Sequence, residues 1–178
     1  MSLVVLKSNH KPEWWRERRR RDRVTLFKPA WVWCEREEKL YSRLLRGFTL
    51  HCCSGYSELG DIKLDINPDF RPTLVADIHY LPFRSQVFDT LICDPPWHGP
   101  QTWMRFQQII REFIRVARTR IILILGTLYY HIPKPFELRE VYIVKKIPPL
   151  VHLVYVWERR ASKLDEFLQA RARAGDEK

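Results

Sequence analysis

The sequence has no long apolar run and only four cysteines among its 178 residues. No segment approaches the roughly 18–20 consecutive apolar residues that a membrane-spanning helix needs, and residues 1–11 lack the long apolar region of a signal peptide. These absences predict a cytoplasmic protein that does not act at a membrane. Because the cysteines show neither zinc spacing nor a disulfide pattern, we expect buried, reduced thiols at Cys34, Cys52, Cys53 and Cys93.

The sequence also lacks internal repeats, Gly/Ser-rich linkers and any cluster of His, Cys and carboxylates with the spacing of metal ligands. We therefore predict no bound metal ion. Hydrophobic residues make up 46% of the chain, which is too many for a disordered protein and enough for a core. At this length we expect a monomer with one domain and terminal appendages.

Positive charge is in excess, and it is concentrated near the N-terminus. The net charge is +10, and residues 1–46 hold 13 Lys and Arg against 6 Asp and Glu, which gives +7. This asymmetry favours a polyanionic partner, nucleic acid ahead of a membrane surface. Residues 11–23 are expected to form a basic helix that contacts phosphates and a base through Trp14, Trp15, Arg18, Arg19, Arg20 and Arg21. The alternative is a solvated basic helix whose tryptophans pack on the core.

Hydrophobic periodicity predicts an α/β fold. Helices are expected at residues 35–45, ending before Gly47, and at residues 103–117, where apolar side chains recur every three or four positions. Strands are expected at residues 48–53, 62–66, 73–76, 87–93, 121–125, 139–147 and 150–157. The first five are almost continuously apolar, which is typical of a parallel sheet between helices, and the last two alternate, which favours a terminal antiparallel hairpin. A charged surface helix is predicted at residues 161–174.

The most specific motif is Asp94-Pro95-Pro96-Trp97, which directly follows a predicted strand. The carboxyl end of a strand is the usual ligand edge of an α/β sheet. The prolines fix the backbone and leave carbonyl oxygens that no sheet ladder engages. An amino group on a base is a poor nucleophile, and hydrogen bonds from it to Asp94 and the Pro95 carbonyl would aim its lone pair while Trp97 stacks on the base. The alternative is a diproline turn with a buried aromatic.

This tetrapeptide resembles the catalytic (Asp/Asn/Ser)-Pro-Pro-(Tyr/Phe/Trp) motif of the amino-methyltransferases that act on adenine N6 or cytosine N4. The run from Ala76 to Asp89 is similar to the segment before that motif in many class I methyltransferases, and the resemblance covers roughly residues 48–158. It implies a Rossmann-like class I fold, S-adenosylmethionine as the cofactor, and methyl transfer as the reaction. It also implies that the catalytic residues are Asp94, Pro95, Pro96 and Trp97.

The resemblance further implies a cofactor site. Gly55 falls where the family has a glycine-rich loop, Asp65 where an acid holds the ribose hydroxyls, and Asp77 where an acid accepts a hydrogen bond from the adenine amine. Two residues depart from the pattern, because Cys53 replaces a common glycine and His51 a common acid. The short connection to the next strand predicts that the first helix of the fold is reduced to a turn. The full predicted cofactor set is His51, Cys53, Ser54, Gly55, Asp65, Ile66, Asp77 and Ile78.

The order and length of the segments bear on the substrate. The cofactor loop precedes Asp94, which is the reverse of the order in messenger-RNA adenine methyltransferases with the same motif. No segment is long enough for the target-recognition insert of sequence-reading DNA methyltransferases, so we expect recognition by shape, which folded RNA supplies. The predicted substrate is cytosine N4 or adenine N6 in structured RNA, ribosomal RNA first. His98, next to Trp97, is a further candidate for the substrate pocket.

Other functions stay open on the same residues. A DNA adenine-N6 or cytosine-N4 methyltransferase is the nearest enzymatic alternative, and the same acceptors could orient a protein amide. A non-catalytic nucleic-acid-binding protein with a degenerate methyltransferase fold would explain the altered loop around Cys53. The predicted organisation is a basic RNA-binding extension at residues 1–46, a methyltransferase core at residues 47–160 and a surface tail at residues 161–178.

Overall fold

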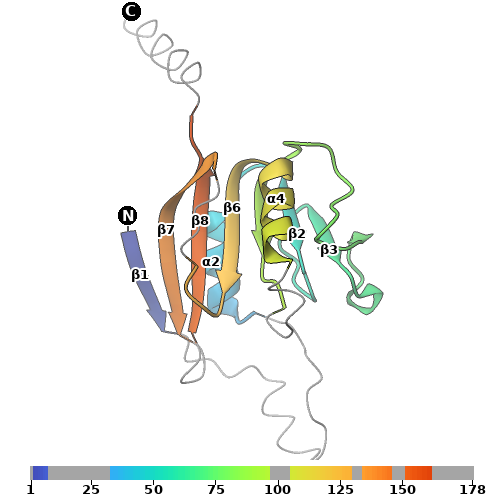
Figure 1. Ribbon diagram of the computed structural model, residues 1–178. Helices are drawn as coiled ribbons and strands as arrows, with labels where there is room; N and C mark the ends of the chain where they lie inside the picture. Colours follow the sequence, from blue (N-terminus) through green and yellow to red (C-terminus); the bar gives the residue numbers. More distant parts are fainter. Residues whose placement is uncertain (1, 8–32, 97–104, 130–133, 146–150, 162–178) are drawn as a thin grey trace, which may run out of the picture.

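One mixed β-sheet runs through the part of the chain that the structure describes (Figure 1). The structure is a computed structural model, and it describes residues 2–7, 33–96, 105–129, 134–145 and 151–161. Within these residues the sheet has eight strands in the order β1-β7-β8-β6-β5-β2-β3-β4. Their bounds are β1 Ser2–Lys7, β2 Thr49–Cys52, β3 Ile62–Asp65, β4 Leu74–Val75, β5 Phe88–Cys93, β6 Ala117–Leu125, β7 Phe136–Lys145 and β8 Val151–Arg159. The helices α2 (Glu35–Leu44) and α4 (Phe106–Val116) lie on opposite faces of the sheet, and the short 3-10 helix η1 spans Pro68–Phe70.

The strand directions confirm the predicted fold. The strands β4, β3, β2, β5 and β6 follow one another in parallel, and β8 is antiparallel to both β6 and β7. This is a mostly parallel, Rossmann-like sheet, and β8 runs opposite to the other described strands. Because parallel strands have their carboxyl ends at one edge, the residues that follow β2, β3, β4 and β5 gather there.

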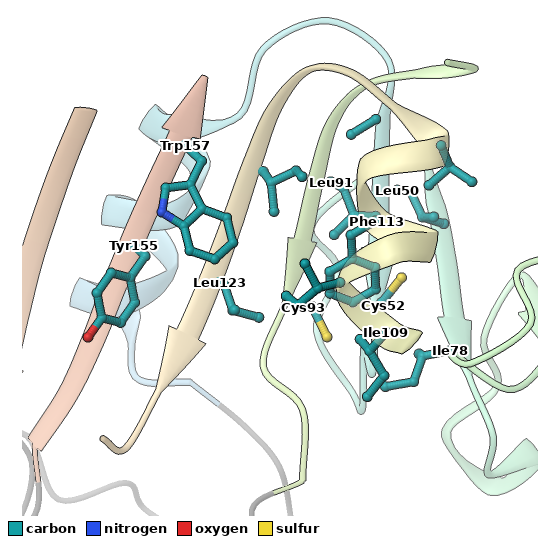
Figure 2. Close-up of a cluster of buried hydrophobic side chains, with 14 of the residues drawn as sticks. Leu50, Cys52, Ile78, Leu91, Cys93, Ile109, Phe113, Leu123, Tyr155 and Trp157 are labelled. Carbon is teal, nitrogen blue, oxygen red and sulfur yellow. The ribbon is translucent and has the colours of Figure 1, made fainter. Parts of the chain in front are cut away.

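The larger core lies on the α4 face of the sheet. Four apolar side chains of α4 face the sheet and are buried, namely Phe106, Ile109, Ile110 and Phe113. They join a cluster that includes leucines and cysteines of β2 and β5 together with two aromatics of β8 (Figure 2). The three- and four-residue spacing of these apolar side chains is the pattern that predicted the helix.

The strand β6 begins earlier than the sequence predicted. We expected a helix through Ala117 and a strand from Ile121, but α4 ends at Val116 and β6 starts directly at Ala117. The polar residues 118–120 concealed the start of the strand, because the prediction relied on continuous hydrophobicity. Residues of this stretch nevertheless pair with β5, so the sheet is longer at this end than the apolar run.

The α2 face of the sheet has a smaller apolar cluster and carries buried charges. Arg120 of β6 is buried, donates from Nη1 to the carbonyl of Leu44 at 2.7 Å and forms an ion pair with Glu158. The buried Glu37 of α2 accepts a hydrogen bond from the backbone N–H of Cys34 at 3.0 Å. Buried charges require such partners. Polar bonds as well as apolar packing therefore fix α2 on the sheet.

The first helix of the fold is reduced to a turn, as predicted. Residues 53–61 connect β2 to β3 without a helix and lie against β2. The ring Nδ1 of His51 lies 3.0 Å from the carbonyl oxygen of Leu59 in this loop. Gly60 has φ +89, and a Cβ there would lie 3.0 Å from the Cβ of His51. The loop thus packs directly on the strand.

The edge strand β1 was not predicted. The sequence placed residues 1–46 in an extension apart from the core, but β1 pairs in parallel with β7, from Ser2 opposite Glu140 to Lys7 opposite Lys145. The helix α2, from the same range, packs on the sheet. The apolar residues 3–6 are the available signal, but their partner strand lies far along the chain. The described parts of residues 1–46 therefore pack with the rest of the sheet.

Some predicted features cannot be compared with the structure. The basic helix at residues 11–23 lies outside the described residues, as does nearly all of the surface helix at residues 161–174. None of the helices that the structure does describe is long and apolar enough to cross a membrane. All four cysteines are free, and Cys53 is half-buried whereas the other three are buried, which corrects the expectation that all four are buried.

Candidate active site

The strand register brings several predicted site residues to one edge of the sheet. The strand β2 lies between β3 and β5, and Cys52 at its end pairs with Leu64 on one side and Cys93 on the other. Asp65 directly follows Leu64, and Asp94 directly follows Cys93. Because neighbouring strands are about 4.8 Å apart, the backbones at these two acids are about 10 Å apart. The loop that follows β2 lies between them.

This loop has the backbone of a glycine-rich loop even where glycine is absent. Gly55 has φ +51 and Cys53 has φ +54, and both values lie in the left-handed region. A residue with a Cβ is disfavoured there by about 1–2 kcal/mol, so Cys53 holds a conformation that glycine adopts more readily. Between them, Ser54 is buried, and its hydroxyl has no hydrogen-bond partner in the described part of the chain.

Asp65 ties the loop to β3. Its carboxylate is buried; Oδ2 accepts the backbone N–H of Gly55 at 2.9 Å, and Oδ1 accepts that of Asn67 at 3.0 Å. Both bonds are charge-assisted and hold the loop backbone in place. A carboxylate has about four acceptor positions, so Asp65 retains capacity for hydroxyl donors of a ligand.

Asp77 lies two residues beyond β4 and is bound by its own turn. Its Oδ1 accepts the backbone N–H of His79 at 2.9 Å and lies 2.6 Å from the Nδ1 of the same residue. Burial alone would raise the pKa of Asp77, but the hydrogen bonds and charge of His79, with Arg105 nearby, outweigh burial and lower the pKa. Asp77 is therefore an ionised acceptor at the ligand edge.

Asp94 begins the predicted catalytic motif and also receives a hydrogen bond. The indole Nε1–H of Trp33 donates to Asp94 Oδ2 at 3.0 Å. Pro95 is buried and Pro96 is exposed. The remaining predicted substrate residues lie outside the part that the structure describes, namely Trp97, His98, Trp14, Trp15, Arg18, Arg19, Arg20 and Arg21.

His51, a predicted cofactor residue, is placed in the interior. Its ring stacks on that of Trp33, with 4.9 Å between ring centroids and 16° between ring planes. Burial lowers the pKa of His51 from its ordinary value of 6.5 to about 4, although the bond to Leu59 opposes this shift. The ring is therefore neutral near pH 7, and the side chain supports Trp33 rather than facing the solvent.

The two predicted isoleucines lie in different environments. Ile66, next to Asp65, is 69% exposed at the edge of the sheet. Ile78, next to Asp77, belongs to the buried cluster beneath α4, where it lies near Ile109 (Figure 2). Of the pair, only Ile66 offers its side chain to a ligand. The side chain of Ile78 instead packs in the core and anchors the turn that carries Asp77.

Sequence reasoning missed a polar and aromatic cluster beside Asp94. Trp33 meets the ring of Tyr41 edge-on at 4.5 Å, and the Tyr41 hydroxyl donates to Glu37 at 3.5 Å. Burial raises the pKa of Tyr41 well above its ordinary value, and the negative charges of Glu37 and Asp94 raise it further. One signal was available, because Glu37, Tyr41 and Leu44 share the spacing of one helix face, which places an acid on the buried side.

The chemistry of this edge suits a ligand that donates hydrogen bonds. Asp65 is the last residue of β3, and Asp77 and Asp94 follow β4 and β5. They can accept bonds from hydroxyl and amino groups and can attract a cationic centre. Among the described residues, no group of three or more His, Cys, Asp or Glu is arranged to hold a metal ion.

Comparison with known proteins shows a likeness in fold. No protein-family model matches the sequence, and no curated protein matches it. The PH0226 protein from Pyrococcus horikoshii OT3 matches with a TM-score of 0.52 and 15% identity, over 69% of this chain and 87% of that one. A TehB-like SAM-dependent methyltransferase from Corynebacterium glutamicum has a TM-score of 0.49 and 13% identity, over 70% of this chain and 87% of that one. The likeness to PH0226 shows the fold alone.

Proposed function

We propose that this protein transfers a methyl group from S-adenosylmethionine to an exocyclic base amine, cytosine N4 or adenine N6, in structured RNA, with ribosomal RNA as the first candidate. The observation that carries the proposal is the placement of Asp94-Pro95-Pro96 directly after β5, beside the left-handed loop that follows β2. The residues that would bind the target amine follow β5, and the loop that would bind the methyl donor follows the adjacent strand β2. The two ligands would therefore lie side by side, as methyl transfer requires.

The residues present fit the adenosine part of the cofactor. Asp65 retains acceptor positions for the two ribose hydroxyls, and Asp77 is an ionised acceptor for the adenine amine. The buried hydroxyl of Ser54, which has no hydrogen-bond partner among the described residues, offers one further polar group in the loop. The exposed Ile66 next to Asp65 provides an apolar surface for the adenine ring. These features support S-adenosylmethionine over an anionic ligand, which three carboxylates would repel.

S-adenosylmethionine supplies an electrophilic methyl group. The Asp94 carboxylate and the Pro95 carbonyl would accept hydrogen bonds from the target NH2. These bonds would draw the nitrogen lone pair out of conjugation with the ring and direct it at the methyl group. The N–C bond would form as the S–C bond breaks, S-adenosylhomocysteine would leave, and the amine would lose one proton to water. Asp94 is an orienting acceptor in this scheme, and the negative charge beside the amine also stabilises the positive charge that develops on nitrogen.

The RNA part of the proposal rests on charge and on what the sequence lacks. The excess of Lys and Arg in residues 1–46 favours phosphate contacts, and the chain has no insert for reading a DNA sequence. Phosphate contacts release counterions, so affinity for RNA should fall steeply between low and moderate salt. Replacing Arg18, Arg19, Arg20 and Arg21 by glutamine should reduce that salt dependence. Binding that hardly changes with salt would argue against the basic segment as the RNA contact.

Titration calorimetry with S-adenosylmethionine tests the cofactor proposal. We expect the wild type to bind, and Asp77→Asn to weaken binding about tenfold, because a carboxylate accepts a stronger hydrogen bond than an amide oxygen. Asp89→Asn is the matched control, since Asp89 lies at the opposite end of β5 and bonds to Phe48 and Arg118. A folded wild type that does not bind, with or without RNA present, would instead favour the non-catalytic nucleic-acid-binding protein.

A further inference from the structure

A tryptophan from outside the predicted core holds the motif carboxylate. Trp33 comes just before α2, and its indole N–H donates to Asp94 Oδ2 at 3.0 Å, although the two residues are 61 positions apart. Neither the resemblance nor any local motif of the sequence points to this residue. The contact therefore connects the N-terminal part of the chain to the end of β5.

The indole is itself held on two sides. One ring face stacks on His51 at 4.9 Å, and the ring meets Tyr41 edge-on at 4.5 Å. His51 is fixed in turn by its contact with Leu59, and Tyr41 is a fully buried residue of α2. Aromatic pairs of this geometry add to packing and restrict the ring orientation. The direction of the Trp33 N–H is therefore set before any ligand binds.

An indole N–H is a suitable partner for a carboxylate that must remain an acceptor. It is a donor only, carries no charge and cannot take up a proton, unlike histidine or lysine. A bond to Oδ2 therefore orients the Asp94 carboxylate without neutralising it. A buried positive charge at the same place would form an ion pair with Asp94 and compete with an incoming amine.

We propose that Trp33 is a positioning residue, whose indole N–H fixes the orientation in which Asp94 accepts the target amine. This inference rests on the proposed function, because it assigns Trp33 a role in the same methyl transfer. It also gives a physical reason for histidine at position 51, where the family commonly has an acid. A flat, neutral ring can stack under the indole, whereas a carboxylate could not support it in this way.

The test compares Trp33→Phe with Tyr41→Phe. Trp33→Phe keeps an aromatic ring between His51 and Tyr41 but removes the N–H, whereas Tyr41→Phe keeps the N–H and removes a hydroxyl that donates to Glu37. We expect Trp33→Phe to lower kcat for methyl transfer to RNA about 10- to 100-fold, the loss typical of a hydrogen bond to a charged group, with S-adenosylmethionine affinity unchanged within about twofold. Tyr41→Phe should leave kcat within about twofold.

A second measurement does not depend on activity. The indole N–H resonance of Trp33, identified by its loss in Trp33→Phe, should move upfield in Asp94→Ala, because the bond to the carboxylate is removed. An unchanged resonance would overturn the proposed contact. A wild-type kcat in Trp33→Phe would overturn the positioning role while leaving the methyltransferase proposal intact. If the wild type transfers no methyl group, both proposals fail, and the resonance then reports a structural contact alone.

Discussion

The two faces of the sheet use buried residues in different ways. The α4 face is apolar from β2 to β8, with α4 contributing Phe106, Ile109, Ile110, Phe113 and Val116 to one large cluster (Figure 2). The α2 face buries Glu37, His51 and Arg120 among its isoleucines and valines. Side chains alternate along each strand, so the same strands serve both faces. The α4 face therefore stabilises the fold through apolar packing, whereas the α2 face also supports the candidate site.

Part of the polarity of the α2 face lies at the carboxyl ends of the strands. His51 stacks on Trp33, which in turn donates to Asp94, and this set lies at the ligand edge. Arg120 instead binds the end of α2 through the carbonyl of Leu44. Each of these contacts fixes an orientation, which apolar packing alone does less specifically. Substitutions on the two faces should therefore have different consequences.

The largest expected effect is on the α4 face. Phe113→Ala should lower the free energy of unfolding by about 3–5 kcal/mol, because it removes a fully buried aromatic ring and leaves a cavity. Methyl transfer per folded molecule should be unchanged. Urea denaturation measures the loss, and Arg111→Ala, at an exposed position of the same helix, should remain within about 0.5 kcal/mol of the wild type. A small loss in Phe113→Ala would contradict the view that this face carries the stability.

The next effect is on the α2 face and depends on pH. The pKa of His51 is about 4 in the folded chain and 6.5 ordinarily, so between these values the unfolded chain binds a proton that the folded chain does not. The contribution of neutral His51 to the free energy of unfolding is thus fully present above pH 6.5. It is lost as the pH falls toward 4, a difference of about 3 kcal/mol. His51→Phe should remove this part of the pH dependence, measured by urea denaturation at several pH values. Identical slopes for the two proteins would show that His51 is not a buried neutral group.

The smallest effect concerns the loop at the site. Cys53→Gly should be more stable than Cys53→Ala by about 0.5–1 kcal/mol, because both remove the thiol and only alanine keeps a Cβ at φ +54. At the exposed helical position Arg111 the order should reverse, since glycine is disfavoured there by about 1 kcal/mol. Thermal denaturation of Cys53→Gly, Cys53→Ala, Arg111→Gly and Arg111→Ala measures both differences in stability. The same order at both positions would contradict the left-handed conformation of Cys53.

The sequence predicted the α4 face better than the α2 face, for a physical reason. The repeat of apolar residues in α4 and the apolar runs in β5 and β6 are local patterns, and they lead directly to a helix on a parallel sheet. The acids Asp65 and Asp77 were identified through the resemblance, and Asp94 through its motif at the end of a predicted strand. The bond between Trp33 and Asp94 spans 61 positions and depends on how α2 packs, which no local pattern contains.

Two further differences have related causes. The edge strand β1 escaped prediction because its partner β7 lies at the far end of the chain, so only the folded sheet brings them together. Ile78 was assigned to the cofactor by its place beside Asp77, but its side chain enters the core. Both residues lie in the turn that follows β4, and the resemblance does not specify which side chain of the turn faces a ligand.

Methyl transfer from labelled S-adenosylmethionine to structured RNA and to duplex DNA, by the wild type and by Asp94→Asn, tests the central claim most directly. The account predicts label in RNA, recovered after digestion as N4-methylcytidine or N6-methyladenosine, and a rate about 100-fold or more lower for Asp94→Asn. Label in DNA alone would show that the substrate is DNA rather than RNA and would leave the proposed reaction unchanged. An Asp94→Asn variant as active as the wild type, or a wild type that binds the cofactor and methylates neither nucleic acid, would contradict the account.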